Sequence, residues 1–258
     1  FSINVTAFGS EAKFSIASGA VVSGGGAQIT ANRMDLAGSM NTSATVTLQP
    51  MTAGRLIDLG STTDAAVNTL ELSDAELDRI SAGFLKIGGS NSGTIAISQA
   101  IHPAGSSTLH LISGSGVTQS APISVANLAV QAAGTVNLSN SSNDASTVAL
   151  RTTAGNLSYS DSNGFTIGNV SGVSGVSSPG SPNLIAFSGD IVVSDTPSAV
   201  DLEGGLGFNI NVTAFGSEAK FTIASGAVVS GGGAQITANC QAPSGSMSTP
   251  GAHVFQHM

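Results

Sequence analysis

The sequence predicts an all-β protein in which short parallel strands stack into a solenoid. Three observations indicate this fold class. Triplets of the form apolar-x-apolar recur about twice in every ~20 residues, a 32-residue segment occurs nearly unchanged at both ends of the chain, and the composition favours strands and tight turns.

The composition is that of a folded but weakly charged β protein. Only 9% of the 258 residues are charged, against about 25% in an average globular protein. Apolar residues make up 41% of the chain and aromatic residues only 4%, while glycine supplies 33 residues. This mixture is too apolar for a disordered chain and suits short strands joined by tight turns.

The charge balance excludes several kinds of partner. Seven basic and 15 acidic residues give a net charge of −8. An acidic surface repels phosphate backbones and anionic lipids, so we expect no nucleic-acid binding and no membrane docking. No apolar run approaches the ~18 residues that span a bilayer, so we expect no membrane insertion. The single cysteine, Cys240, can form no internal disulfide.

The chain begins and ends with the same phrase. Residues 1–32 return as residues 208–239 with only two differences. The differences are Ser2 against Asn209 and Ser15 against Thr222. Repetition at a fixed period is typical of stacked architectures, so we interpret the phrase as the start of each module in a longer array.

This interpretation sets the predicted domain boundaries. We predict one β-solenoid module over residues 1–240, followed by a divergent and poorly ordered tail over 241–258. Pro243 and Pro250 lie in that tail, where we expect them to interrupt strand pairing.

Two series of triplets define the predicted strands. The first begins at Leu85, Leu109, Leu128, Val148 and Phe165, and the second at Ile95, Val117, Val136 and Leu157. Because residues i and i+2 of a strand share a face, the outer members of each triplet are predicted to point inward. The predicted inward ladder is Leu85, Ile87, Leu109, Leu111, Leu128, Val130, Val148, Leu150, Phe165 and Ile167. The middle residues, such as Lys86, His110 and Ala149, are predicted to face outward.

An antiparallel sandwich is the alternative, since it also has short strands with frequent turns. Hairpin signals are few, Asn163–Gly164 being the exception, whereas Gly-Ser and Ser-Asn corners abound. From Ile87 to Asn143 there is no Asp, Glu, Lys or Arg. Such neutral strands aggregate when their edges are open, and a stack of coils pairs its internal edges. Both points favour the stack.

Two segments depart from the strand pattern. LELSDAELDRISAG (70–83) predicts a short helix near 73–82, with Ser73 as N-cap and Glu76 completing a capping box. Leu77 and Ile80 would share one face, and Gly83 could end the helix. The second segment, 171–183, is rich in Gly, Ser and Pro and predicts a surface loop.

The sequence contains only weak signals of a catalytic or binding site. The phrase SGGGAQ (23–28 and 230–235) lacks the lysine and the helix of a phosphate-binding loop, which favours a coil corner. Carboxylates gather in two places that could serve catalysis or bind calcium, but without a calcium-loop phrase. These groups are Asp74, Glu76 and Asp78, and then Asp190, Asp195, Asp201 and Glu203.

The remaining reactive residues have no recognisable partners. No zinc spacing relates the histidines, and no nucleophile motif surrounds the serines or the cysteine. The histidines are His102, His110, His253 and His257. We therefore predict no catalytic, cofactor or metal site, and a protein that is not an enzyme.

The helix and strand phrases together resemble a known family. LELSDAELDRISAGFLKIGGSNSGTIAISQAI and SGSGVTQSAPISVANLAVQAAGTVNLSN resemble exoproteins of the filamentous haemagglutinin type, the passengers of two-partner (type Vb) secretion. The resemblance is clearest over about 56–170. It implies a right-handed parallel β-helix, export of the full-length protein through an outer-membrane partner transporter, and a secreted or cell-surface location. The family's secretion domain has no counterpart in these 258 residues.

The function that this resemblance implies is adhesion. The chain would be a non-catalytic repeat module of a rod-like adhesin that presents binding surfaces to an unidentified ligand on a host or neighbouring cell. Two other functions stay open. One is a carbohydrate-active β-helix enzyme with Asp190, Asp195 and Asp201 along a groove, and the other is a spacer repeat of a contact-dependent toxin.

Overall fold

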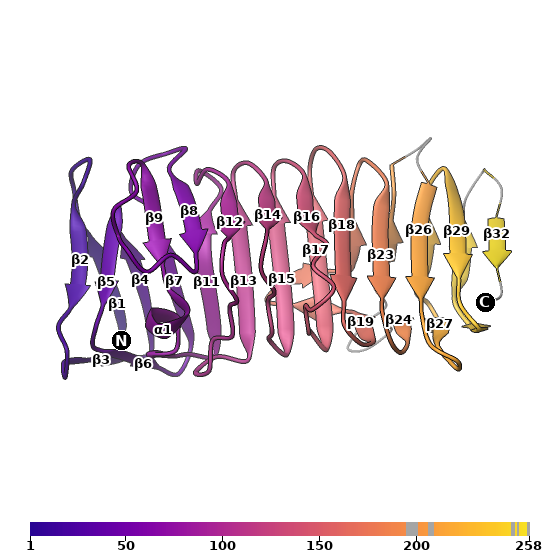
Figure 1. Ribbon diagram of the computed structural model, residues 1–258, viewed down its shortest axis with the longest axis horizontal. Coiled ribbons are helices and arrows are strands. Elements are labelled where there is room, and N and C mark those ends of the chain that lie inside the picture. The colour runs from indigo at the N-terminus through magenta and orange to yellow at the C-terminus, as the bar shows by residue number, and fades with distance from the viewer. Residues whose placement is uncertain (195–200, 206–208, 249–250, 252, 257–258) are drawn as a thin grey trace. The chain divides into compact units, whose positions relative to one another are not determined.

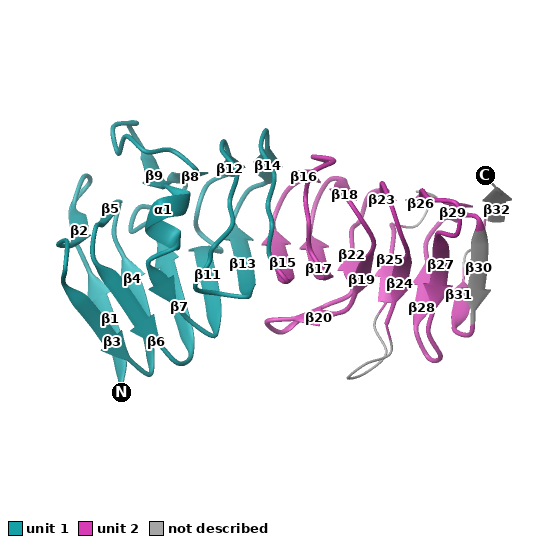
Figure 2. Ribbon diagram, turned by 60° about the horizontal axis from the view of Figure 1, so that its bottom comes forward, with its two compact units in different colours: residues 1–125 teal, residues 126–258 magenta. Residues whose placement is uncertain are grey.

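The computed structural model describes residues 1–194, 201–205, 209–248, 251 and 253–256. The chain divides into two compact units, Phe1–Val125 and Ala126–Met258, drawn in teal and magenta in Figure 2. Among the described residues the regular structure is almost all strand, and every strand pair except β20–β21 is parallel. The predicted all-β class and the predicted parallel pairing are therefore confirmed.

Unit 1 contains several parallel sheets that the chain visits in turn (Figure 1). One sheet has the order β1 (Ser2–Thr6), β4 (Gly26–Thr30), β7 (Thr45–Gln49), β11 (Phe84–Gly89) and β13 (Thr108–Ser113). A second contains β3 (Val21–Gly24), β6 (Ser39–Thr42) and β10 (Ile80–Ser81). A third has the order β9 (Thr69–Leu72), β8 (Leu56–Leu59), β12 (Ile95–Ile97) and β14 (Val117–Gln119), and β2 (Lys13–Ile16) pairs with β5 (Arg33–Leu36).

Unit 2 repeats this arrangement. One run of neighbours is β15 (Asn127–Ala132), β17 (Thr147–Thr152), β19 (Phe165–Ile167), β24 (Ile191–Val193), β27 (Lys220–Ile223) and β30 (Cys240–Pro243). A branch from β17 contains β22 (Val176–Ser177), β25 (Asp201–Glu203), β28 (Val228–Ser230) and β31 (Ser246–Ser248). The other run is β16 (Val136–Leu138), β18 (Leu157–Asp161), β23 (Pro182–Ala186), β26 (Asn209–Ala214), β29 (Gly233–Thr237) and β32 (His253–Gln256).

Within each unit the core consists of aliphatic side chains stacked in register. All ten residues of the predicted inward ladder are buried. The in-register pairs are Leu85 with Leu109, Ile87 with Leu111, Leu128 with Val148, Val130 with Leu150, Ile95 with Val117, and Val136 with Leu157. Strand alternation therefore places one side chain of each pair directly on the next, as the triplets predicted.

The predicted register is wrong after Val148. Val148 pairs with Ile167 rather than Phe165, and Leu150 pairs with Val176. The long strand β17 thus has two short partners, β19 and β22. Between them the chain leaves the sheet as the hairpin β20 (Asn169–Val170) and β21 (Val173–Ser174). Triplet spacing alone does not reveal this interruption, because Ile167 follows Val148 at the usual coil length, whereas the hairpin lengthens the step from Leu150 to Val176.

The same hairpin covers Ala149, which was predicted to face outward. Ala149 is buried on the outer side of its strand with Ala129, beneath Val170 and Val173. His110 is also buried, and Lys86 is half-buried. The outer face of a sheet can therefore be covered by a local excursion, which strand alternation does not foresee.

The segment 171–183 is accordingly more than a surface loop. It contains β21, β22 and the first residues of β23, and it contributes the buried side chains of Val173 and Val176. The sequence did not predict this because β21 and β22 are each only two residues long.

The predicted helix is present but shorter than expected. α1 spans Asp74–Leu77, a single turn. The Glu76 carboxylate accepts hydrogen bonds from the Ser73 backbone N–H at 2.9 Å and from the Ser73 hydroxyl at 2.7 Å. This confirms the Glu76 side of the predicted capping box. Ile80 is buried, but it belongs to β10, which pairs with β6. Strand pairing therefore ends the helix well before Gly83.

The two copies of the repeated phrase fold strand for strand. β1 to β4 correspond to β26 to β29. The strand pairs β1–β4, β2–β5 and β3–β6 recur as β26–β29, β27–β30 and β28–β31 at matching positions in the described residues. For example, Asn4 pairs with Gln28 and Asn211 with Gln235. A Cβ added to Gly38 or Gly245 would lie 2.4 Å from a carbonyl oxygen, so both corners need glycine for close approach.

The correspondence continues into the segment 241–258, where the sequence predicted a poorly ordered tail. The structure has strands β30, β31 and β32 there, paired with β27, β28 and β29. Pro243 stands opposite Ile223 within a paired strand, so the expectation that it interrupts pairing is wrong. Pro250 lies outside the described residues.

Candidate functional site

Much of the chain's positive charge gathers in one polar region of unit 1. Four of the seven basic residues of the sequence, Lys13, Arg33, Arg55 and Arg79, contact or line this region. It lies where the ends of β2 and β5 meet the loop 60–68 and the turn of helix α1. We call these four basic residues, the loop 60–68 and α1, together with the side chains that they contact, the polar region of unit 1.

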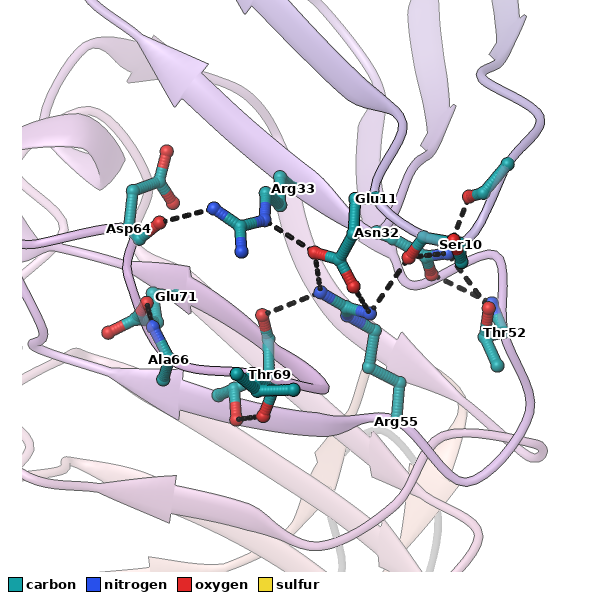
Figure 3. Close-up of polar contacts among 12 residues, drawn as sticks. Ser10, Glu11, Asn32, Arg33, Thr52, Arg55, Asp64, Ala66, Thr69 and Glu71 are labelled. Carbon is teal, nitrogen blue, oxygen red and sulfur yellow. Dashed lines mark hydrogen bonds and ion pairs between the residues drawn. The ribbon is translucent and has the colours of Figure 1, made fainter.

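Glu11 and two arginines form the charged centre of this region (Figure 3). Arg33 Nε donates to Glu11 Oε2 at 2.6 Å, and Arg55 Nη2 reaches the same oxygen at 3.2 Å. Arg55 Nη1 adds a contact to Glu11 Oε1 at 3.3 Å, so the Arg55 pair is bidentate. Hydrogen bonds from Arg55 and then from Arg33 lower the pKa of Glu11.

Arg55 also binds two backbone carbonyls and thereby joins separate parts of the fold. Its guanidinium donates to Ser10 O at 3.1 Å and to Thr69 O at 3.2 Å, and its side chain is only 2% exposed. Arg33 extends the chain of contacts by donating to Asp64 O at 2.8 Å. A buried guanidinium with this number of acceptors is a structural clamp first of all.

Asn32 completes the neighbouring corner. Its amide nitrogen donates to the carbonyls of Gly9 and Ser10 at 2.9 and 3.0 Å, and its oxygen accepts from the N–H groups of Met51 and Thr52. Asn239, the same position in the second copy, also donates to the corresponding carbonyl, that of Gly216. An asparagine at this position thus links successive corners in both copies.

Glu71 holds the loop 60–68 against the sheet. Its carboxylate accepts hydrogen bonds from Ser61, from Thr63 and from the backbone N–H of Ala66, the last at 2.7 Å. Burial acts to raise the pKa of Glu71, but these hydrogen bonds to the ionised form outweigh it and the pKa is lowered. The loop therefore has a fixed anchor on β9.

A cavity of about 410 Å³ opens beside this loop. It is lined by Lys13, Asp35, Ala37, Ser61, Thr62, Asp64, Ser73, Glu76 and Arg79. Lys13 and Asp35 form an exposed ion pair at 3.2 Å, which salt will screen. Hydroxyls, carboxylates and cations of this kind suit a polar, hydroxyl-bearing ligand better than an apolar one.

Two carboxyl groups of the cavity have different environments. Glu76 is engaged by Ser73 and by the backbone N–H of Leu36, the latter at 3.0 Å. For Asp64, burial raises the pKa and the charge of Glu76 raises it further. Asp64 has a φ of 52°, an uncommon conformation for a residue with a side chain.

The acidic residues predicted on the helix have structural partners. The Asp74 carboxylate accepts the backbone N–H of His102 at 2.6 Å, and the Asp78 carboxylate accepts that of Ala104 at 2.8 Å. Their i, i+4 spacing therefore fastens the loop 102–104 to α1. The structure brings Glu76, and neither of the two aspartates, to the wall of the cavity.

The second acidic group is divided between separate contacts. Asp190 accepts the backbone N–H of Lys220 at 2.8 Å, and Glu203 accepts the Ser177 hydroxyl at 3.1 Å. Asp201 is exposed on β25, and Asp195 lies outside the described residues. Within the described part of the chain, no group of three or more His, Cys, Asp or Glu side chains could hold a metal ion.

The remaining predicted positions are located as follows. The phrase 23–28 forms the corner between β3 and β4, and 230–235 the corner between β28 and β29, as expected for coil corners. His102 is exposed and His110 buried. Cys240 and His253 lie in β30 and β32, and His257 lies outside the described residues.

Sequence reasoning missed the cluster of Glu11, Arg33 and Arg55. Their even spacing along the chain follows the coil period and was the available signal. Comparison with known proteins identifies no relative, since no family model, curated protein or solved structure matches this chain. No helix in the described residues has the length and apolar character needed to cross a bilayer.

The clamp role of Arg55 predicts a measurable loss on substitution. We expect Arg55→Met to lower the free energy of unfolding by about 2–3 kcal/mol, because the Ser10 and Thr69 carbonyls lose a buried donor. The same variant should raise the pKa of Glu11, since its largest cause of lowering is removed. NMR titration of the Glu11 carboxyl and chemical denaturation measure the two effects. Arg151→Met, on the exposed side of β17, is the control, and equal losses in both variants would contradict the clamp.

Proposed function

We propose that this chain is a repeat module of a large secreted or surface-displayed adhesin of the filamentous haemagglutinin type. Its role is to hold binding surfaces on a stacked, rod-like scaffold, and it has no catalytic step. The observation that supports this proposal best is the constant offset in numbering between the strand pairs of the two copies. A fixed offset allows identical modules to stack one after another without a change of register.

The proposed architecture is a right-handed parallel β-helix. It is supported by the order in which the chain visits its sheets, since β23, β24 and β25 pair with β26, β27 and β28, which pair in turn with β29, β30 and β31. Crossover connections between parallel strands of one sheet are right-handed in about 98% of cases. Electron density for a crystal of the chain would test both the closure and the hand.

Adhesion by such a module depends on the excursions from the regular coils. The hairpin β20–β21 covers the sheet with Val170 and Val173 and leaves Asn169, Gly172 and Ser174 exposed. Loops on a rigid scaffold are the usual sites of contact, and many copies along a rod raise avidity without strong individual contacts. The full-length protein would pass through an outer-membrane partner transporter to reach its ligand.

A carbohydrate-active enzyme is the second candidate. The polar cavity favours it, because Asp64 and Glu76 differ in their surroundings. Spacer repeats of a contact-dependent toxin would share the scaffold and differ only in what the full-length chain attaches to it.

The test of adhesion uses the exposed side of the hairpin. Deleting 171–183 would remove β22 and the buried Val176, so substitutions are preferable. We expect a bead-displayed tandem array to attach to cultured host or bacterial cells, and Asn169→Glu with Ser174→Glu to reduce attachment several-fold by adding charge to the contact surface. Flow cytometry of bound beads measures this.

The matched control changes exposed residues of a regular coil, with Asn137→Glu and Ser139→Glu. Both variants should keep the circular dichroism of the parent array. An array that binds no cell type would reject the adhesin, and release of sugars from cell-surface glycans by the same beads would favour the enzyme. Equal attachment by all three arrays would place the contact surface away from the hairpin.

A further inference from the structure

The first three strands of the chain form an edge whose cover can be identified within the same molecule. In the described residues, β1 pairs only with β4, β2 only with β5 and β3 only with β6. The corresponding strands of the second copy, β26, β27 and β28, are paired on both sides. We call the strands β1, β2 and β3 the first edge.

The cover of the second copy consists of the three strands β23, β24 and β25, which we call the cover coil. Its inward side chains stand opposite those of the second copy. The pairs are Leu184 with Val212, Ile191 with Phe221, and Leu202 with Val229. Backbone hydrogen bonds of 2.9 Å join Phe215 N to Ala186 O and Ala224 N to Val193 O.

An aromatic contact marks the corner of this interface. The rings of Phe187 and Phe215 are stacked, with centroids 5.9 Å apart and planes inclined by 15°. Phe8 is the position of the first copy that corresponds to Phe215. Its side chain is 77% exposed, against 39% for Phe215. In the second copy Phe187 stacks on Phe215, whereas the first edge presents the equivalent ring, that of Phe8, exposed.

The aliphatic positions of the first edge show the same difference. Val212 and Val229 are buried, whereas their counterparts Val5 and Val22 are half-buried. Ala227 is fully buried and its counterpart Ala20 is exposed. The sequence differences between the copies, at positions 2 and 15, fall on exposed residues of the first copy. The inward-facing residues of the two edges are therefore the same.

We propose that the first edge is an assembly surface for the cover coil of a second copy of this chain, in the register that β23, β24 and β25 have on the second repeat. The occupant is thus a parallel coil of defined sequence, with its Phe187 stacked on Phe8. This inference specifies the interface that the proposed tandem array requires, and it rests on that proposal only for its biological setting.

The test supplies the cover coil in the position that the repeat dictates. Residues 182–207 are added directly before Phe1 of the full chain, and amide hydrogen exchange is followed by mass spectrometry. Peptides that include position 2 or 15 differ in mass from their counterparts at 209 and 222, so the two copies can be followed separately. We expect exchange in the first edge to slow by about tenfold or more, towards the rates of the second copy.

The control carries Leu184→Asp, Ile191→Asp and Leu202→Asp in the added segment only, because these side chains face the core in the native cover. Slower exchange with the native segment and unchanged exchange with the control would support the assembly surface. Unchanged exchange with both segments would overturn it, and equal protection by both would overturn the specific register. Cell attachment does not enter the measurement, so failure of the adhesin proposal would leave this result unaffected.

Discussion

Asp161→Ala is expected to lower the free energy of unfolding by about 3–5 kcal/mol, because it removes the acceptor for three buried or partly buried donors. Asp161 is fully buried in β18. Its Oδ2 accepts the Tyr159 hydroxyl at 2.5 Å and the Ala145 N–H at 2.9 Å, and its Oδ1 accepts the Asn163 N–H at 3.0 Å. Chemical denaturation measures the loss.

Asp161→Asn is the matched control for this prediction. The amide oxygen can still accept hydrogen bonds, so the loss should be clearly smaller than for alanine. Tyr159 remains a donor over the accessible pH range, since burial and then the charge of Asp161 raise its pKa well above the ordinary value. Equal losses in the two variants would contradict the role of the acceptor.

The same residue predicts a dependence on pH. Burial raises the pKa of Asp161 and outweighs its hydrogen bonds, so the folded state holds this proton to a higher pH than the unfolded state does. The part of the stability that comes from this bound proton is therefore present below the unfolded pKa and is lost as pH rises through the folded pKa. Glu11 and Glu71 have lowered pKa values, so their contributions to stability change with pH in the opposite direction. The contribution of Asp161 is isolated by measuring the free energy of unfolding against pH for the wild type and for Asp161→Asn and taking the difference.

Leu150→Ala should be about as damaging, with an expected loss of about 2–5 kcal/mol from the lost burial and the cavity that remains. Leu150 is completely buried and stands between Val130 on one neighbouring strand and Val176 on the other. A single truncation therefore weakens two interfaces of the stack. Thermal or chemical denaturation gives the size of the effect.

Arg151→Ala is the control on the same strand, since Arg151 is exposed and pairs in register with Gln131 and Ser177. Its expected effect lies within about 0.5 kcal/mol. In a stack stabilised by neighbouring coils, the faster hydrogen exchange caused by Leu150→Ala should be strongest in β15, β17 and β22. Uniformly faster exchange throughout both units would contradict a nearest-neighbour stack.

The strand pattern could be predicted wherever the period is regular. Leu85 and Leu109, or Leu128 and Val148, stand opposite one another because each coil uses about the same number of residues. The prediction failed at Val148, which stands opposite Ile167 rather than Phe165, and at Leu150, whose partner Val176 comes after the hairpin β20–β21. It failed again at Ile80, where a strand partner outweighs the local preference for helix.

The candidate site was less predictable than the fold. Asp74 and Asp78 were noted as a possible carboxylate pair, and the structure uses them to bind backbone N–H groups. Glu11, Arg33 and Arg55 were not noted, although they meet in space. Contacts between charged residues one coil apart can be predicted only when the strand register is known. The positions of the charged residues in the sequence do not give that register.

The sequence alone determined that the chain is all-β, that its strands run in parallel and that its aliphatic triplets are stacked inward. Both the period of two within strands and the repeat between coils can be recognised in the order of the residues. The tertiary structure decided which outer faces are covered, where the helix stops and which polar groups meet in unit 1. Those outcomes depend on contacts between residues whose separation in the sequence does not follow the strand or coil period, such as Val170 with Ala149 or Arg55 with Thr69. Their energies arise only after the coils have been brought together.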